Sequence, residues 1–296
     1  MTTITIKDDF DLAKIADSGQ CFRVVRIQDE LYRFITGDNI LYVRQIADET
    51  YEISCSESDF YENWSEYFDF SRDYKGIRES VPESDTYMHN AAECGRGIRI
   101  LRQEPWEMLI SFIISQRKSI PAIRTSIEMI CERFGRAVTT EYETVYTFPT
   151  AEEIMRCKVT GENGCGSDKP QDKGRADSCG CETLLAECKL GYRLKYIIET
   201  VKAVYYREID LEALEGLGSE QLLDELKRLY GVGEKVANCI ALFAYGRVEL
   251  APVDTWIRKV IDGIYEGVNP FPGYGDVAGI MQQYIFYYAQ THKAEF

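Results

Sequence analysis

Lys235 and Asp254 are the two residues of this chain whose types and spacing best fit a chemical step. Lys235 follows the glycine turn Gly231-Val232-Gly233 and falls in the first turn of a predicted helix, whose positive end disfavours an ammonium group. A neutral lysine amine can attack an electrophilic carbon and form a Schiff base. Asp254 lies 254 − 235 = 19 residues later, and its carboxylate could accept a proton or stabilise a developing cation. The pair therefore predicts covalent catalysis.

Each of these residues also has a purely structural interpretation. Lys235 could be a solvated lysine, and Asp254 follows Pro252-Val253 at a position that suits a helix N-cap. For either residue alone we favour the structural interpretation, but the two together, beside a turn suited to phosphate, favour catalysis. Cys239 is at i+4 from Lys235 and is predicted to line the same pocket, although such a cysteine is more often a core residue.

Other catalytic and cofactor chemistries have little support in the sequence. His89 and His292 are the only histidines, which argues against a histidine triad or a histidine-rich metal site. The sequence has neither GxxxxGK[ST] nor GxGxxG after a predicted strand, the usual nucleotide-binding motifs. We therefore expect no cofactor and no metal ion.

Five of the ten cysteines fall in one segment, where a zinc site is the alternative to free thiols: Cys157, Cys165, Cys179, Cys181 and Cys188. Their spacing contains no C-x₂-C pair and no histidine is close in sequence, so we favour reduced, metal-free cysteines. Residues 158–187 contain few large apolar side chains, which predicts a flexible, solvated insert.

A helical hairpin is predicted to position Lys235. Apolar residues recur at helical spacing on both sides of the glycine turn, at Leu222, Leu223, Leu226, Leu229, Val236, Ala237, Ile240 and Phe243. Two helices joined by so short a turn form a helical hairpin. Backbone N–H groups at the start of the second helix suit an anion, and Gly231, Val232 and Gly233 are therefore candidate phosphate-binding residues.

The rest of the chain divides into a β-rich part and a helical part. Runs rich in β-branched and aromatic residues are separated by turn residues and predict an antiparallel meander, at 22–27, 31–36, 40–46 and 50–54. Helical periodicity follows from about residue 88. We therefore expect an α+β protein with an N-terminal antiparallel β-sheet subdomain (1–95) and a mostly helical domain (96–296).

More specific helix predictions follow from the same patterns. Phe60, Trp64, Tyr67 and Phe68 should cover the sheet from one helix. Pro105 suits a first helical position, and Ser119 suits a cap. Further helices are expected at 192–206, 210–217 and 277–290.

The net charge of −15 argues against a general nucleic-acid binder, since such domains are usually basic. The charge is unevenly distributed, however. Residues 45–71 contain no Lys or Arg, whereas residues 192–207 carry four basic residues against Glu199 alone, or 4 − 1 = +3. An acidic body with one basic face can still hold DNA through a few phosphate contacts.

The sequence contains no apolar run of about 18 residues, so we expect no membrane contact. The first ten residues lack a basic n-region and a long apolar core, which predicts a cytoplasmic protein without a signal peptide.

LKRLYGVGEKVANCIALF and VELAPVDTWI resemble the helix-hairpin-helix, Gly/Pro-Asp motif of the DNA glycosylase superfamily. A lysine at 235 matches the bifunctional members, which remove the base and then nick the strand. The endonuclease III and adenine-glycosylase branches usually carry a four-cysteine iron–sulfur loop after this motif. This chain has no cysteine after Cys239, which argues against both branches.

Other stretches, within a similarity that runs from about residue 9 to 289, resemble 8-oxoguanine DNA glycosylase. SGQCFR, which contains Gly19, is similar to the segment whose glycine carbonyl accepts the N7–H that 8-oxoguanine has and guanine lacks. GIMQQYIF is similar to the C-terminal helix, which implies Gln282 at the base edge and Phe286 stacked on the base. Cys239 would cover the other face. Taken singly, Gly19 also fits a turn, Gln282 a surface and Phe286 a core; their joint match favours the base-binding roles.

The resemblance also implies DNA contacts. Arg117 or Tyr192 would fill the gap left by an extruded base, Arg193 would lie near the partner strand, and Gly231–Gly233 would hold a phosphate. Taken alone, Arg117 also fits a solvated turn. The chain departs from eukaryotic members, which have an asparagine run in place of Arg117-Lys118-Ser119 and an arginine near Ala122. Trp256 stands where many members have histidine. The overall pattern is that of the shorter bacterial members.

The resemblance implies a bifunctional glycosylase/AP lyase that excises 8-oxoguanine from double-stranded DNA in base excision repair. The expected protein is a monomer in the bacterial cytoplasm, associated with the nucleoid. Two alternatives remain open at this point. One is a glycosylase of the same fold for another damaged base, such as an alkylated purine; the other is a non-catalytic DNA-binding module.

Overall fold

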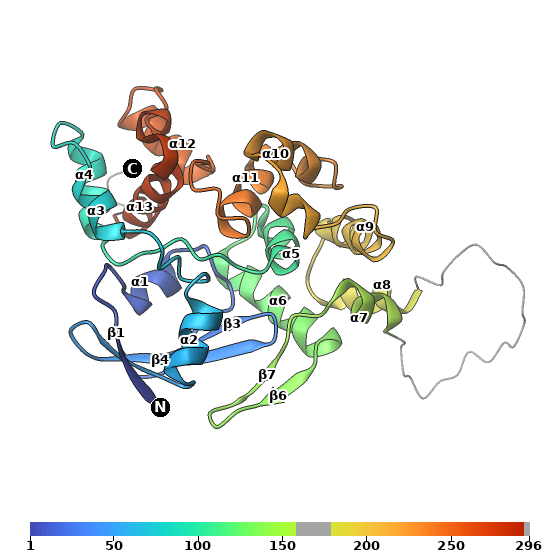
Figure 1. Cartoon of the computed structure of the whole chain (residues 1–296). Coiled ribbons are helices and arrows are strands. Elements are labelled where there is room, and N and C mark those ends of the chain that lie inside the picture. Colours follow the sequence, from blue (N-terminus) through green and yellow to red (C-terminus); the bar gives the residue numbers. More distant parts are fainter. Residues whose placement is uncertain (158–178, 293–296) are drawn as a thin grey trace, which may run out of the picture.

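An antiparallel sheet near the N-terminus lies beside a larger group of helices (Figure 1). The structure is a computed structural model, and it describes residues 1–157 and 179–292. The arrangement confirms the predicted α+β class.

The sheet holds five strands in the order β1-β5-β4-β3-β2, and all neighbouring pairs are antiparallel. The strands are β1 (Thr2–Thr5), β2 (Val25–Gln28), β3 (Leu31–Thr36), β4 (Asn39–Ala47) and β5 (Thr50–Ile53). The meander from β2 to β5 is confirmed. Strand β1 was not predicted, because in this four-residue strand only Ile4 is buried and its pairing with β5 is a long-range contact.

Two short helices accompany the sheet, α1 (Leu12–Asp17) and α2 (Glu57–Trp64). The four aromatic residues predicted to cover the sheet from one helix are all buried, but only Phe60 and Trp64 lie on α2, whereas Tyr67 and Phe68 lie in the turn that follows it. They form an aromatic cluster in which Phe34 of β3 contacts Phe68 edge to face, with ring centroids 5.1 Å apart. This packing gives the sheet its apolar core.

The helical part begins with α3 (Tyr74–Glu79), α4 (Thr86–Cys94), α5 (Pro105–Ser115), α6 (Ile120–Phe134) and α7 (Ala151–Arg156). It continues with α8 (Cys179–Glu187), α9 (Arg193–Tyr205), α10 (Ser219–Lys227), α11 (Glu234–Phe243), α12 (Thr255–Gly263) and α13 (Ala278–Thr291). Pro105 begins α5 as predicted, and Ser119 is the N-cap of α6 but makes no side-chain capping bond.

Several local features differ from the sequence expectations. The helix expected at 210–217 is only a 3₁₀ turn, Ala213–Gly216, and another 3₁₀ segment, Phe271–Val277, precedes α13. A small hairpin of β6 (Ala137–Thr139) and β7 (Thr144–Tyr146) was not predicted. The last part of the expected solvated insert, from Cys179, forms α8, since Cys181, Leu185 and Cys188 pack into the core. Residues 158–178 lie outside the described part of the chain.

Each of the two hydrophobic clusters contains residues from both sides of the proposed boundary at residue 95. The sheet cluster includes Leu101, whereas Phe22, Tyr74 and Met88 belong to the helical cluster. The division into 1–95 and 96–296 remains a prediction, and the packing favours assigning α3 and α4 to the helical part. Within the described residues, no helix is both long enough and apolar enough to span a membrane.

Candidate active site

The hairpin of α10 and α11 forms as predicted, and its turn requires glycine. Gly231 has φ +87°, and a Cβ built there would lie 2.4 Å from Cγ of Tyr196. Both the left-handed backbone and the close approach of the Tyr196 ring therefore exclude a side chain. Gly233 is the N-cap of α11, whose first N–H groups have no acceptor within their own helix. The turn thus has the geometry of an anion site, and its role as a phosphate clamp remains a prediction.

A cavity of about 1080 Å³ lies beside this hairpin. It is lined by residues from distant parts of the chain, including eight of the predicted site residues: Gly19, Arg117, Gly233, Lys235, Cys239, Asp254, Gln282 and Phe286. The other predicted residues do not line it. Val232 is buried in the core, Gly231 lies in the hairpin turn against Tyr196, and Tyr192 and Arg193 lie at the start of α9.

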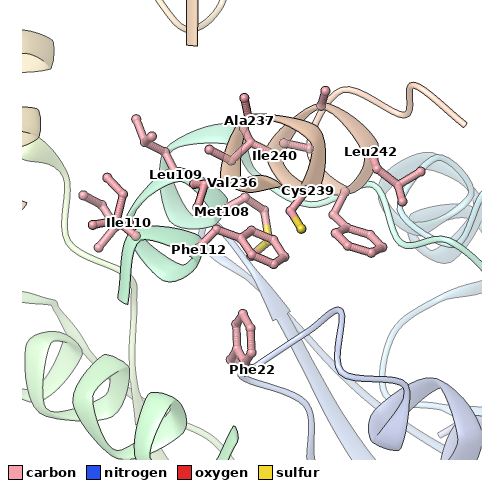
Figure 2. Close-up of a cluster of buried hydrophobic side chains, with 14 of the residues drawn as sticks. Phe22, Met108, Leu109, Ile110, Phe112, Val236, Ala237, Cys239, Ile240 and Leu242 are labelled. Atoms are coloured by element: carbon pink, nitrogen blue, oxygen red, sulfur yellow. The ribbon is translucent and has the colours of Figure 1, made fainter. Parts of the chain in front are cut away.

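Lys235 is half-buried against an aromatic wall. Its Nζ lies 5.5 Å from the centroid of the Phe112 ring, and that ring is stacked on Phe243 with centroids 5.6 Å apart. Figure 2 shows α5 packed on α11. The side chains of Phe112 and Cys239 lie on the side of these helices that faces Phe22. The lysine amine therefore lies in the pocket wall, close to the face of an aromatic ring.

Cys239 follows Lys235 by one helical turn, and its thiol hydrogen-bonds the lysine. Burial raises the pKa of the Cys239 thiol, while the charge of Lys235 lowers it. Burial has the larger effect, so the thiol is neutral at pH 7 and can act as a hydrogen-bonding partner and an apolar wall.

Asp254 is both a helix cap and a pocket residue. Its Oδ1 accepts a hydrogen bond from the Ile257 backbone N–H at 2.8 Å, which confirms the predicted cap of α12. Burial raises the pKa of the Asp254 carboxyl, whereas the Ile257 N–H and the positive charge of Lys235 lower it. The structural interpretation is confirmed, and the cap also holds the carboxyl group in the pocket that Lys235 lines, so the catalytic role of Asp254 remains a prediction.

Gly19 lies directly against Phe286. Its φ is +77°, and a Cβ there would be 2.8 Å from Cε1 of Phe286 and 3.6 Å from Cδ1 of Ile120. The absence of a side chain at Gly19 therefore keeps the space beside the Phe286 ring open. The two residues come from opposite ends of the chain.

Two glutamines hold the Gly19 loop in place, and the sequence analysis assigned a role to neither. Gln283 on α13 donates its side-chain N–H to the Ser18 carbonyl. Gln20 donates to the Arg99 carbonyl at 2.8 Å, and its Oε1 accepts from Leu101 N at 2.7 Å. Both side chains are buried. In the sequence, both glutamines are polar residues among apolar neighbours. That pattern alone does not distinguish an exposed polar residue from a buried one that forms hydrogen bonds.

Gln282, which precedes Gln283 on α13, is only 4 % exposed and lines the pocket. Its Oε1 has no hydrogen-bond partner within the described residues. A buried amide oxygen without a donor is costly, so this atom is suited to accept a hydrogen bond from a bound molecule. The neighbouring Phe286 supplies a ring at the same wall.

The predicted DNA-contact residues differ in exposure. Arg117 is exposed at the pocket and Tyr192 is 53 % exposed. Arg193 is only 7 % exposed, and its Nε donates to the Gln116 carbonyl at 2.8 Å. In this structure the Arg193 guanidinium thus holds the turn at Gln116, and its predicted place near DNA remains a prediction.

The charge distribution favours the pocket side for an anionic partner. Across residues 1–157 and 179–292, several cations near the pocket or hairpin form no salt bridge: Arg117, Lys118, Lys195, Lys235 and Arg258. Arginines of the sheet part are paired, as in Arg33–Glu143 and Arg44–Glu52. The described residues also contain no group of three or more His, Cys, Asp or Glu placed to hold a metal ion.

Comparison with known proteins now adds to this geometry. Residues 3–109 match the family model of the N-terminal domain of 8-oxoguanine DNA glycosylase. A probable N-glycosylase/DNA lyase of Methanothermobacter thermautotrophicus is 32% identical over 217 residues, which cover 70% of this chain and 68% of that protein. The chain belongs to the 8-oxoguanine DNA glycosylase/lyase family.

Solved structures agree with this assignment. The 8-oxoguanine glycosylase/lyase of Clostridium acetobutylicum, in complex with double-stranded DNA containing cytosine opposite 8-oxoguanine, superimposes with a TM-score of 0.83. The C. acetobutylicum protein and this chain are 32% identical, and the match covers 99% of each chain. The structure of MBOgg1 with a low-affinity DNA ligand gives a TM-score of 0.85 at 32% identity, covering 98% of this chain and 96% of that chain. The similarity therefore extends over both the sheet and the helices.

Proposed function

We propose that this chain is a bifunctional DNA glycosylase/AP lyase that excises 8-oxoguanine from double-stranded DNA and then cleaves the strand, as the first enzyme of base excision repair. The observation that carries the proposal is that Lys235 and Asp254 line the same pocket as Gly19 and Phe286. The hairpin and the start of α12 supply the reactive groups, and the two ends of the chain supply a site for a base. We further propose a monomer in the bacterial cytoplasm, associated with the nucleoid.

Base recognition follows from the shape and polarity of the pocket. The extruded base would lie against Phe286 on one face and Cys239 on the other, while the Gln282 amide would bond to its edge. The Gly19 carbonyl would accept the N7–H of 8-oxoguanine, which guanine lacks. One such hydrogen bond discriminates by roughly 1–3 kcal/mol, so the fit of the base must contribute further.

The covalent step uses Lys235 of the hairpin and Asp254 at the start of α12. The neutral amine of Lys235 attacks C1′ of the sugar, the bond from C1′ to the base nitrogen breaks, and the base leaves with that electron pair. The Asp254 carboxylate stabilises the positive charge that develops on the sugar. The nitrogen then loses a proton, the C1′–O4′ bond breaks as O4′ takes up a proton, and a protonated Schiff base joins Lys235 to C1′. Removal of a C2′ proton then expels the 3′ phosphate by β-elimination.

DNA binding would use the pocket side, where four cations form no salt bridge within residues 1–157 and 179–292. Arg117, Lys118, Lys235 and Arg258 all border the pocket. Extruding a base costs a few kcal/mol, and Arg117 or Tyr192 would fill the vacated space. The acidic remainder of the chain predicts weak, salt-sensitive binding to undamaged DNA.

Borohydride trapping tests the covalent mechanism. Wild-type protein with a duplex containing 8-oxoguanine should give a reduced covalent adduct, and Lys235→Gln should give none. Lys259→Gln is a matched control, because Lys259 is exposed on α12, with its Nζ 4.9 Å from the centroid of the Trp256 ring. An adduct formed by Lys235→Gln would show that another amine is the nucleophile.

The two alternatives are tested with the same reagents. A panel of duplexes carrying 8-oxoguanine or an alkylated purine separates the base classes: excision of the alkylated purine in preference to 8-oxoguanine would contradict the proposed substrate. A non-catalytic DNA-binding module would cut none of them, and its salt-dependent binding would not change in Asp254→Asn.

A further inference from the structure

Gln116 lines the pocket and forms hydrogen bonds to three elements of the fold. It follows the last residue of α5, and its side-chain Nε2 donates to the Ile113 carbonyl at 3.2 Å and to the Gly231 carbonyl of the hairpin turn at 3.0 Å. Its own carbonyl accepts from Arg193 Nε at 2.8 Å and from the Tyr192 hydroxyl at 3.3 Å. One residue thus connects α5, the hairpin and the start of α9.

The next residue, Arg117, is one of the two residues proposed to fill the space left by the extruded base. Arg117 is exposed, borders the pocket and has φ +50°, a conformation that a residue with a side chain adopts infrequently. Lys118 then anchors the other end of the turn, because its Nζ donates to the Lys189 carbonyl at 2.8 Å. The backbone at Arg117 is therefore held between the Gln116 bonds and the Lys118 bond.

A helix cap would need only part of this arrangement. The bond from Gln116 to Ile113 satisfies a free carbonyl in the last turn of α5, which is what a C-terminal cap does. The bond to Gly231 spans 115 residues and does not cap α5. It connects the turn that carries Arg117 to the turn that is suited to bind phosphate.

We propose that Gln116 is a positioning residue for base extrusion. It couples the hairpin turn at Gly231 to the Arg117 turn, so that seating a phosphate at the hairpin also places Arg117 and Tyr192 for insertion into the base stack. The inference rests on the proposed function and adds a residue that acts on the DNA through its neighbours. Gln116 touches neither the base nor the reacting atoms in this scheme.

Two variants of Gln116 test the coupling. Gln116→Met keeps the length of the side chain but removes the donor, and Gln116→Glu directs a carboxylate at the carbonyl oxygens of Ile113 and Gly231. Single-turnover excision of 8-oxoguanine paired with cytosine should fall about 10-fold for the methionine variant and further for the glutamate variant. Binding to undamaged duplex should stay at the wild-type level. Gln45→Met, at an exposed position on β4, is the matched control and should behave as wild type.

A second duplex isolates the extrusion step. When an abasic analogue stands opposite 8-oxoguanine, the base is unpaired and costs less to extrude. The defect of Gln116→Met should therefore shrink on this duplex, and 2-aminopurine beside the paired lesion should show slower unstacking. This pattern supports the positioning role.

Other patterns overturn the inference. An equal fractional loss on both duplexes would show that Gln116 does not act on extrusion. A lower melting temperature together with lost affinity for undamaged DNA would identify a structural cap instead. If the wild-type protein excises 8-oxoguanine from neither duplex, the proposed function itself fails and the inference falls with it.

Discussion

The ring of Phe286 lies 2.8 Å from the position that a Cβ at Gly19 would occupy. Residue 19 belongs to the loop between α1 and β2 and residue 286 to the last helix, so this contact joins two ends of the chain in one wall of the pocket. A methyl group there would push the ring into the pocket or displace the loop that Gln283 holds. The contact explains why the position is glycine, independently of its carbonyl.

Gly19→Ala should reduce excision of 8-oxoguanine by about 10- to 100-fold, because overpacking of this size costs about 1–3 kcal/mol. Cleavage of a pre-formed abasic site should be less affected, since no base needs to enter. Gly37→Ala is the matched control: Gly37 also has a positive φ, but a Cβ there meets nothing within 4 Å. Equal losses in the two variants would assign the effect to backbone strain.

Gly231→Ala should destabilise the hairpin by about 1–3 kcal/mol, because the new methyl group meets the Tyr196 ring at 2.4 Å. Affinity for damaged and undamaged duplexes should fall equally, since a phosphate clamp does not distinguish bases. Tyr196→Ala introduced into the same variant should restore part of the affinity by making room. Gly267→Ala, which has φ +85° and open space, should change neither stability nor binding beyond its backbone cost. Selective loss for damaged DNA would contradict the clamp.

Asp254→Asn should lower excision by about 10²–10³-fold, in the range seen when a transition-state charge stabiliser is removed. Stability at pH 7 should be retained, because the asparagine oxygen can still accept from Ile257 N and no buried charge remains. A large fall in melting temperature would instead show that the residue is chiefly a cap.

The acid limb of the pH–rate profile should report Asp254. Burial raises the pKa of this carboxyl above the ordinary aspartate value of 3.8, so the active carboxylate is lost on acidification at a higher pH than for an exposed aspartate. In Asp254→Asn this acid limb should disappear from the residual activity. A limb that persists unchanged would belong to another group.

Glu107 should make stability depend on pH. Burial raises its pKa to about 7, against 4.5 in the unfolded chain, although Arg23, 3.7 Å away, opposes the rise. Between these values the folded state binds the proton and the unfolded state does not, so stability falls as pH rises from about 4.5 to 7. The expected change is about 1–3 kcal/mol, and Glu107→Gln should flatten it in denaturant titrations at several pH values. In that variant Arg23 should still have an ion-pair partner, because its Nε lies 3.3 Å from Oε1 of Glu128.

The sequence by itself determined the parts of the site that depend on neighbours a few residues away. Helical periodicity on both sides of the glycine turn predicted α10 and α11 and placed Lys235 in a first turn. The order Pro252-Val253-Asp254 predicted the cap of α12, because capping joins a side chain to an N–H three residues on. The β2–β5 meander followed from short runs and turn residues.

Only the tertiary structure decided which distant groups meet. No local sequence pattern predicts that Gly19 contacts Phe286 or that Gln283 donates to Ser18. The pairing of β1 with β5 and the bond from Arg193 to Gln116 are likewise contacts between distant parts of the chain. These contacts result from the packing of the sheet against the helices, which depends on the whole chain at once. Periodicity and capping are set within one or two turns, whereas the pocket is formed by elements that approach one another only after the core has closed.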